Sequence, residues 1–353
     1  MKIKVLELFA GIGALSKALE RLDIEHEIVD AVEIDKYAVK SFNAIHNTNF
    51  EPQDICEWEK DIEVDLIMHG SPCQDFSLAG KQAGGDKDSG TRSSLMYETI
   101  RIVEKLKPKY VIWENVKNLL SKKHKHNFDA YLEKMNELGY VNYYQVLNAK
   151  DYGIPQNRER VFTVSIRKDI DKGYTFPEPQ ELKLKLKDML EDEVDEKYYL
   201  SGKKNHNKNM KQILCDNLIN SGILSNNTII NHSYTNGLCG KNKNSRQALE
   251  GVAVDNNVKV LGNYSPSGYE ASRIVDCNGI APIVKENYGT VTATYVNLRI
   301  RKLTPKECWR LMGFDDADFE KASKVNSNAQ LYKQAGNSIV VNVLEAILTN
   351  LLK

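Results

Sequence analysis

The segment GSPCQDFSLAG holds the residue with the clearest capacity for chemistry. Cys73 follows Pro72 in a predicted tight turn after the apolar run VDLIMH, and the polar residues Gln74 and Ser77 stand beside it. A lone cysteine is more often a small buried hydrophobe, but a turn at the end of a strand favours an exposed thiol. Open α/β sheets build their sites at the carboxyl ends of their strands. The segment therefore predicts a nucleophilic cysteine.

A carboxyl group and two arginines accompany this thiol. Glu114 closes the predicted strand YVIWENV, so its side chain and Cys73 are expected to face one pocket. In QNRER, Arg158 and Arg160 are expected to alternate on one strand face. A nearby cation raises the thiolate fraction of a cysteine and so makes it a better nucleophile.

These groups together suit attack on an electron-poor ring such as cytosine. The Cys73 thiolate would add to carbon 6, a protonated Glu114 would donate to ring nitrogen 3, and an arginine would hold the carbonyl oxygen. Carbon 5 then becomes nucleophilic enough to accept a methyl group. A base must finally remove the carbon 5 proton, and the sequence does not name that base.

The glycine-rich turn in LELFAGIGALS predicts a ligand site near the N-terminus. Gly11 and Gly13 lie where backbone N–H groups can approach a ligand, although a tight turn with a packing role is the alternative. Ser16 stands where the dinucleotide fingerprint needs its third glycine, which disfavours a pyrophosphate and leaves an adenosyl ligand. Glu33 follows about 20 residues later, as expected for a carboxylate on ribose hydroxyls. Asp54, at the end of an expected third strand, is placed to accept from an adenine amino group.

Strand and helix patterns alternate through the first half of the chain and predict a mostly parallel α/β sheet covered on both faces. The expected strands are 2–9, 27–34, 64–73, 110–116, 143–149 and 160–166, and the expected helices are 11–22, 36–46, 94–108 and 126–140. Residues 181–197 are charged and are also predicted to be helical. Helical patterns return in TPKECWRLMGF and NSIVVNVLEAILTNLL.

The region 201–263 is rich in asparagine, lysine, serine and glycine, and it shows little periodicity. Cations outnumber acids there: the cations include Lys203, Lys204, Lys208, Lys211, Lys241, Lys243 and Arg246, while the acids include Asp216 and Glu250. Composition alone leaves two interpretations open, a solvated surface segment or a face that binds phosphates.

Bulk composition describes a globular chain of 353 residues with 41% hydrophobic residues, long enough for two domains. The net charge of zero lacks the basic excess typical of nucleic-acid binders, yet it does not exclude one basic face. The six cysteines form no C-x-x-C pair, and the histidines show no ligand spacing, so we predict no metal site. The N-terminal apolar run is short and interrupted, so we expect no signal peptide and a cytoplasmic protein.

The ordered set FAGIG, GSPCQDFS, ENV, QNRER, RKLTPKECWRLMGF and QAGNSIVVNV resembles the DNA cytosine-5 methyltransferase family, in its compact bacterial or phage form. The resemblance covers nearly the whole chain and implies a Rossmann-like fold that uses S-adenosyl-L-methionine. It implies Cys73 as nucleophile and Glu114, Arg158 and Arg160 as cytosine-pocket groups. The methyl-donor contacts that it implies are Phe9, Gly11, Gly13, Glu33, Asp54, Ile55, Pro72, Leu95, Asn337 and Ser338. It also implies DNA contacts by Gln74, Ser77 and Arg92, and a mobile loop of about 77–94 that closes on DNA.

The same resemblance implies a division of the chain. Residues 1–180 form the catalytic and cofactor-binding domain, and 181–300 form a smaller, β-containing target-recognition domain. Residues 301–329 return the chain, and 330–353 complete the catalytic domain with a last helix. The family's late Thr-Leu pair is replaced here by Ile283 and Val284, to which we assign no role.

The expected substrate is double-stranded DNA, from which the target cytosine must be flipped to expose its ring. We expect a monomer that serves either a restriction–modification system, with a separate endonuclease, or as a solitary or phage methylase. Two alternatives stay open, a tRNA cytosine-5 methyltransferase of the same family and a catalytically silent DNA-binding relative. A nicotinamide enzyme is disfavoured by Ser16.

Overall fold

The computed structural model describes residues 2–72, 95–200, 257–263, 273–286, 292–296 and 299–352. Four of the predicted site residues, Cys73, Gln74, Ser77 and Arg92, lie outside the described residues, as do the expected loop 77–94 and the basic segment 201–256.

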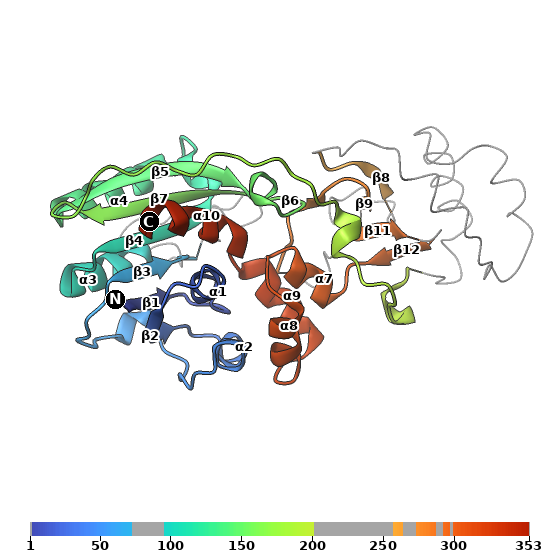
Figure 1. Ribbon diagram of the computed structural model, residues 1–353, viewed down its shortest axis with the longest axis horizontal. Helices are drawn as coiled ribbons and strands as arrows, with labels where there is room; N and C mark the ends of the chain where they lie inside the picture. Colours follow the sequence, from blue (N-terminus) through green and yellow to red (C-terminus); the bar gives the residue numbers. More distant parts are fainter. Residues whose placement is uncertain are drawn as a thin grey trace, which may run out of the picture.

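A six-stranded sheet forms the centre of the larger part of the molecule (Figure 1), with the strand order β2-β1-β3-β4-β7-β5. Strands β2, β1, β3 and β4 run parallel to one another, while β7 is antiparallel to both β4 and β5. The strand bounds are β1 (Ile3–Leu8), β2 (His26–Val32), β3 (Leu66–His69), β4 (Tyr110–Val116), β5 (Tyr140–Asn148) and β7 (Glu159–Arg167). The predicted, mostly parallel α/β sheet is confirmed.

Both faces of this sheet are buried, because successive residues of a strand point to opposite sides. Val5 of β1 packs into one hydrophobic core and Leu6 into the other. The first core contains α1 (Ala14–Arg21) and α10 (Val341–Leu352), and the second contains α3 (Met96–Leu106) and α4 (Lys125–Glu137). Strands that are covered on both sides read as nearly continuous apolar runs, which is why the first half of the sequence reveals its strands clearly.

A second, four-stranded sheet lies at the other end of the molecule (Figure 1), in the order β12-β11-β9-β8. Its strands are β8 (Val260–Asn263), β9 (Arg273–Asp276), β11 (Ala293–Val296) and β12 (Arg299–Lys302). Two short strands join the two ends, because β10 (Ala281–Pro282) pairs in parallel with β6 (Gln156–Asn157). The chain then returns through α7 (Pro305–Arg310), α8 (Asp316–Ser323) and α9 (Asn328–Asn337), and α8 packs beside α2 (Lys36–His46).

The predicted helix over 181–197 is wrong. Two short 3-10 turns, Leu186–Met189 and Glu196–Tyr198, are the helical structure present there. The backbone N–H groups of Leu186 and Lys187 donate to the carbonyl oxygens of Gly279 and Cys277, at 2.9 and 2.8 Å, instead of to their own segment. Contacts with the turn after β9 therefore replace the hydrogen bonds of a helix, and the charged pattern reflects solvent exposure alone.

The start of α7 shows how local sequence and tertiary structure agree. Thr304 caps the helix, Pro305 takes its first position, and Glu307 completes a capping box. The carboxylate of Glu307 also accepts two hydrogen bonds from the guanidinium of Arg301, at 2.8 and 2.6 Å. Both side chains are almost fully buried, so this pair fixes α7 against β12.

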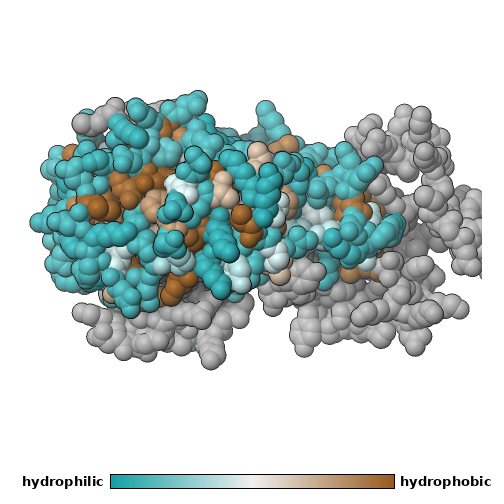
Figure 2. Space-filling view, turned by 90° about the horizontal axis from the view of Figure 1, so that it is seen from below, coloured by the Kyte–Doolittle hydropathy of each residue, from teal (hydrophilic) through white to brown (hydrophobic). Residues whose placement is uncertain are grey.

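The segment Asn328–Leu352 is long and apolar enough to cross a membrane by length and composition alone. It forms two helices, α9 and α10, and Leu331, Leu344 and Ile347 on them are buried in the first core. Polar residues cover most of the described surface in Figure 2, with smaller apolar areas between them. We therefore interpret the segment as core helices of a globular domain.

We predict that Glu307→Gln lowers the free energy of unfolding by about 3 kcal/mol, because it leaves a buried guanidinium without its countercharge. Urea denaturation measures the change. The matched control is Glu133→Gln on the exposed face of α4, which is expected to change stability by less than about 0.5 kcal/mol. A loss no larger than that of the control would show that the pair contributes little.

Candidate active site

Three neighbouring parallel strands, β2, β1 and β3, end level at one edge of the large sheet, and the parallel strand β4 continues three residues further. Leu8 at the end of β1 pairs with Val32 of β2 on one side and with His69 of β3 on the other, and His69 pairs with Trp113 of β4. The chain segments after these residues carry FAGIG, Glu33, GSPC and Glu114. This edge is where open α/β sheets bind ligands.

The turn after β1 has a backbone that requires its glycines. Gly11 and Gly13 both have positive φ, at 56° and 80°, and so does Phe9 at 54°. A Cβ on Gly13 would lie 2.1 Å from Nε2 of His46, whereas a Cβ on Gly11 would meet nothing within 4 Å. Gly13 is therefore needed for packing against α2, while the space beside Gly11 is open to a ligand.

Glu33 is held in place beside this turn. Its carboxylate accepts from the backbone N–H of Gly11 at 3.0 Å and from that of Asp35 at 2.8 Å. Burial raises the pKa of Glu33 above its ordinary value. The next residue, Ile34, is 69% exposed, the most exposed of the large hydrophobic side chains in the described residues. Sequence reasoning missed Ile34, although an apolar residue between two acids was a visible signal.

The N-terminus of α1 is capped by a carboxylate from within the sheet. Glu7 of β1 is buried and accepts from the backbone N–H of Ser16 at 3.1 Å and from the Ser16 hydroxyl. Burial raises the pKa of Glu7 to about 7. A helix N-terminus is a common phosphate site because its first N–H groups are free. Here Glu7 uses that position, which gives a physical reason why Ser16 replaces a glycine and why a pyrophosphate is disfavoured.

Asp54 does not end a strand, contrary to the sequence prediction. It caps the 3-10 turn η1 (Ile55–Glu57), and its carboxylate accepts from the backbone N–H of Cys56 at 2.9 Å. The preceding residue, Gln53, donates its backbone N–H to the carbonyl oxygen of Glu33 at 2.9 Å. This bond places Asp54 and the buried Ile55 near Glu33, at the ends of β1 and β2. The expected strand is absent, but Asp54 still lies near Glu33 as the sequence predicted.

The segment that leads to Cys73 is fixed by β4. The indole N–H of Trp113 donates to the Ser71 hydroxyl at 3.1 Å, and the Asn115 amide donates to the Ser71 carbonyl at 3.4 Å. A Cβ on Gly70 would lie 3.5 Å from Ile339 and 3.8 Å from a carboxylate oxygen of Glu114. Pro72 is half-buried and is the last described residue before Cys73. These contacts hold Gly70 and Ser71 beside β4, close to Glu114.

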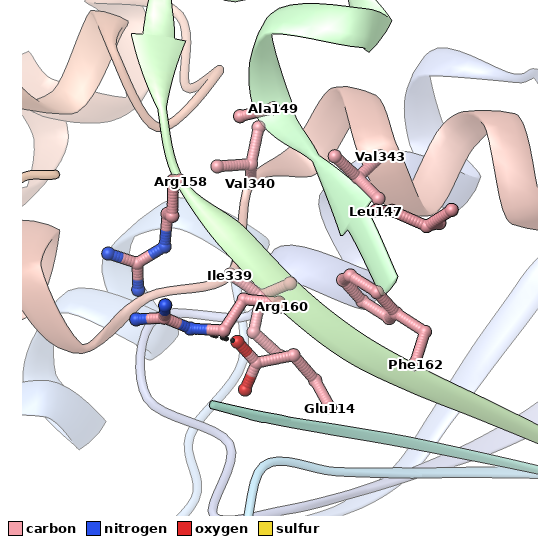
Figure 3. Close-up of a pocket in the computed structure, with 9 residues that line it drawn as sticks. All are labelled: Glu114, Leu147, Ala149, Arg158, Arg160, Phe162, Ile339, Val340 and Val343. Carbon is pink, nitrogen blue, oxygen red and sulfur yellow. Dashed lines mark ion pairs between the residues drawn. The ribbon is translucent and has the colours of Figure 1, made fainter. Parts of the chain in front are cut away.

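That pocket lies between β4, β7 and the start of α10 (Figure 3). Glu114 and Arg160 point toward each other in it, with 2.8 Å between a carboxylate oxygen and Nε of the arginine. Apolar side chains form much of the remaining wall, and the lining consists of Glu114, Leu147, Ala149, Arg158, Arg160, Phe162, Ile339, Val340 and Val343. The structure thus brings Glu114 and Arg160 together as the sequence indicated.

Comparison with known proteins decides the family. The sequence profile described as C-5 cytosine-specific DNA methylase matches residues 3–353. The chain belongs to this family. It is a DNA (cytosine-5-)-methyltransferase, and the tRNA-methylating and silent alternatives are less well supported.

Curated relatives align with this methylase over almost the whole of both chains. It is 34% identical to the type II methyltransferase M2.ScrFI of Lactococcus lactis subsp. cremoris, over 99% of both chains. It is 32% identical to the orphan methyltransferase M.SPRI of Bacillus phage SPR, over 99% of this chain and 98% of the phage protein. Among solved structures, the Entamoeba histolytica methyltransferase EhMeth aligns with a TM-score of 0.67 and 17% identity, over 100% and 98% of the two chains, which supports the fold alone.

The remaining predicted donor residues of the methylase lie on two helix ends. Asn337 ends α9 with an exposed side chain, and Ser338 follows it with a buried one. Leu95 precedes α3 and packs, half-buried, against the second core. Among the residues that the structure describes, no group of three or more histidine, cysteine, aspartate or glutamate side chains is arranged to hold a metal ion.

Arg158 differs from the sequence prediction in position and in partners. It precedes β7 instead of lying on it, so the two arginines do not alternate along one strand. Its buried guanidinium donates to the backbone carbonyl oxygens of Val284, Gly336 and Ser338.

We predict that Glu7→Gln makes the methylase less sensitive to pH between about 4.5 and 7. The folded state holds a proton on Glu7 up to a pKa of about 7, whereas the unfolded state releases it near 4.5. The stability of the wild type therefore falls as pH rises through this window, and above it the full penalty remains. Glutamine does not titrate. The stability of Glu7→Gln relative to the wild type should therefore increase with pH, by at most about 3 kcal/mol above pH 7. Urea denaturation at pH 4.5, 6 and 8 measures this, and parallel curves for the two proteins would refute it.

Proposed function

We propose that this methylase transfers the methyl group of S-adenosyl-L-methionine to carbon 5 of a cytosine turned out of double-stranded DNA, through a covalent bond between Cys73 and carbon 6. The observation that carries the proposal is the facing pair of Glu114 and Arg160 beside the segment that leads to Cys73. A donor cradle lies at the same sheet edge, two strands away.

The residues at the end of β1 and β2 fit an adenosyl ligand. Glu33 offers a carboxylate fixed by two backbone N–H groups, and hydroxyl groups of a ribose are suitable donors to it. The open space beside Gly11 and the exposed side chain of Ile34 offer room and an apolar surface for a base. The capped N-terminus of α1 favours a ligand without phosphate. When bound, S-adenosyl-L-methionine supplies the methyl group.

Glu114 and Arg160 fit the edge of a cytosine. A protonated carboxyl group can donate to ring nitrogen 3 and a guanidinium can donate to the carbonyl oxygen, which draws electron density from the ring and makes carbon 6 open to a thiolate. Both side chains are largely buried, so these bonds form where water competes poorly. Their mutual ion pair must open to admit the base, and it keeps the two groups oriented until then.

The base must leave the helix to reach this pocket, because stacking hides the faces of the ring. We propose that residues 181–300 provide the target-recognition domain, and that 1–180 and 330–353 form the catalytic domain, joined by 301–329. The basic composition of 201–256 supports contact with phosphates. We expect a cytoplasmic monomer that protects DNA beside a separate endonuclease or works as a solitary methylase.

The decisive test is incorporation of label from methyl-labelled S-adenosyl-L-methionine into mixed-sequence duplex DNA, with total tRNA in parallel. We predict 5-methylcytosine in DNA, its loss in Cys73→Ser, and a decrease of roughly 10²-fold or more in Glu114→Gln. Cys277→Ser is the matched control and should keep activity, since Cys277 lies beside the smaller sheet. Full activity of Cys73→Ser would exclude the covalent route, and label in tRNA alone would change the substrate.

A further inference from the structure

Three backbone segments meet at Gln156 and Arg158. The first, residues 281–286, lies between β9 and β11 of the smaller sheet and contains β10, which pairs with β6. The second is the end of α7, and the third is residues 336–338 at the end of α9. Both side chains are buried, with 0% and 4% of their surface exposed. Buried polar groups of this kind are expensive unless they are satisfied, so their partners define their role.

Gln156 binds the first two segments through its side-chain amide. Its Nε2 donates to the carbonyl oxygen of Leu311 at 2.7 Å, and its Oε1 accepts from the backbone N–H of Val284 at 3.0 Å. The backbone N–H of Ala281 donates to the carbonyl oxygen of Pro155 at 2.7 Å. The segment 281–286 is therefore hydrogen-bonded to the large domain at two points before Arg158 adds a third.

Arg158 binds the first and third segments through the two ends of its guanidinium. Nη1 donates to the carbonyl oxygen of Val284 at 3.1 Å, while Nη2 donates to those of Gly336 at 3.2 Å and Ser338 at 2.9 Å. The last two carbonyls flank Asn337, one of the residues proposed for the donor site. The planar, forked guanidinium can hold carbonyls on two segments at a fixed separation, which a lysine ammonium cannot do.

Gly336 makes the same junction from the opposite side. A Cβ on Gly336 would lie 2.1 Å from the backbone nitrogen of Glu286 and 2.3 Å from the carbonyl carbon of Lys285. The backbones of the first and third segments are thus in direct contact, and only glycine permits it.

We propose that Arg158 is a positioning residue that couples the segment 281–286 to the Asn337–Ser338 turn of the donor site, and is not a contact to the cytosine. The inference rests on the proposed function, because it takes that turn as part of the donor site. Arg160 differs from Arg158 in that its Nε faces Glu114 in the pocket. The two arginines of QNRER therefore have different roles, Arg160 in the pocket and Arg158 at the junction of the backbone segments. A shift of 281–286 when DNA is bound would pass to the donor site through Arg158.

The test compares Arg158→Lys with Arg160→Lys in the full-length protein. Binding of S-adenosylhomocysteine is measured by calorimetry in the absence of DNA. We expect Arg158→Lys to weaken it about tenfold or more, as for loss of hydrogen bonds to a charged group, and Arg160→Lys to leave it within about twofold of the wild type. In methylation assays at saturating donor, Arg158→Lys should raise KM for DNA while kcat falls only a few-fold, whereas Arg160→Lys should lower kcat.

A second variant guards against a general loss of folding. Gly336→Ala disturbs the same junction and leaves the Arg158 side chain unchanged. The double variant should lose no more donor affinity than the worse single variant, because both changes disrupt the same set of contacts. Thermal unfolding shows whether each variant is folded. If Arg158→Lys does not fold, the donor affinity of Gly336→Ala tests the inference instead. Donor affinity that is unchanged in Arg158→Lys, with methylation lost, would overturn the inference. A wild type that binds no S-adenosylhomocysteine would instead contradict the proposed donor.

Discussion

The parallel pairing of β2, β1, β3 and β4 in register is the constraint on which the site depends. Because Leu8 pairs with both Val32 and His69, and His69 pairs with Trp113, four loops must leave the sheet within a short distance of one another. The proposed donor site lies at the ends of β1 and β2, and the proposed base pocket uses β4 together with β7. No loop has to be long to bring these parts together, since the sheet itself sets their spacing.

The C-terminal part of the chain completes the pocket at the edge of the large sheet. Strands β1 to β7 lack one wall of the pocket, and Ile339, Val340 and Val343 from the start of α10 supply it. The chain reaches this position only after passing through the smaller sheet. The buried pair Arg301–Glu307 fixes the start of the returning segment on β12 of the smaller sheet, and the hydrogen bond from Gln156 to Leu311 holds its next part on β6. The proposed recognition and catalytic domains are thus separate in the sequence but joined by backbone contacts.

The sequence predicted what depends on local pattern and missed what depends on distant partners. Buried strands and amphipathic helices of the large sheet were visible as apolar runs, and Glu33 and Glu114 were correctly expected at strand ends. The segment 181–197 was misread as helical because its charges follow exposure, while its backbone bonds to Gly279 and Cys277 have no local signal. Arg158 was misplaced for the same reason, since its hydrogen bonds go to carbonyl groups far along the chain. Asp54 was misplaced because it caps a local 3-10 turn instead of ending a strand.

The position of α10 has a consequence for how this protein is made. Strand β1 lies inside the sheet and is synthesised long before α10, yet Leu344 and Ile347 of α10 belong to the same hydrophobic core as Val5 of β1. During translation this core stays incomplete, because the long region between α1 and α10 must be produced before α10 can pack. Such a nascent chain exposes hydrophobic surface for most of its synthesis, the condition under which aggregation competes with folding and chaperones are needed.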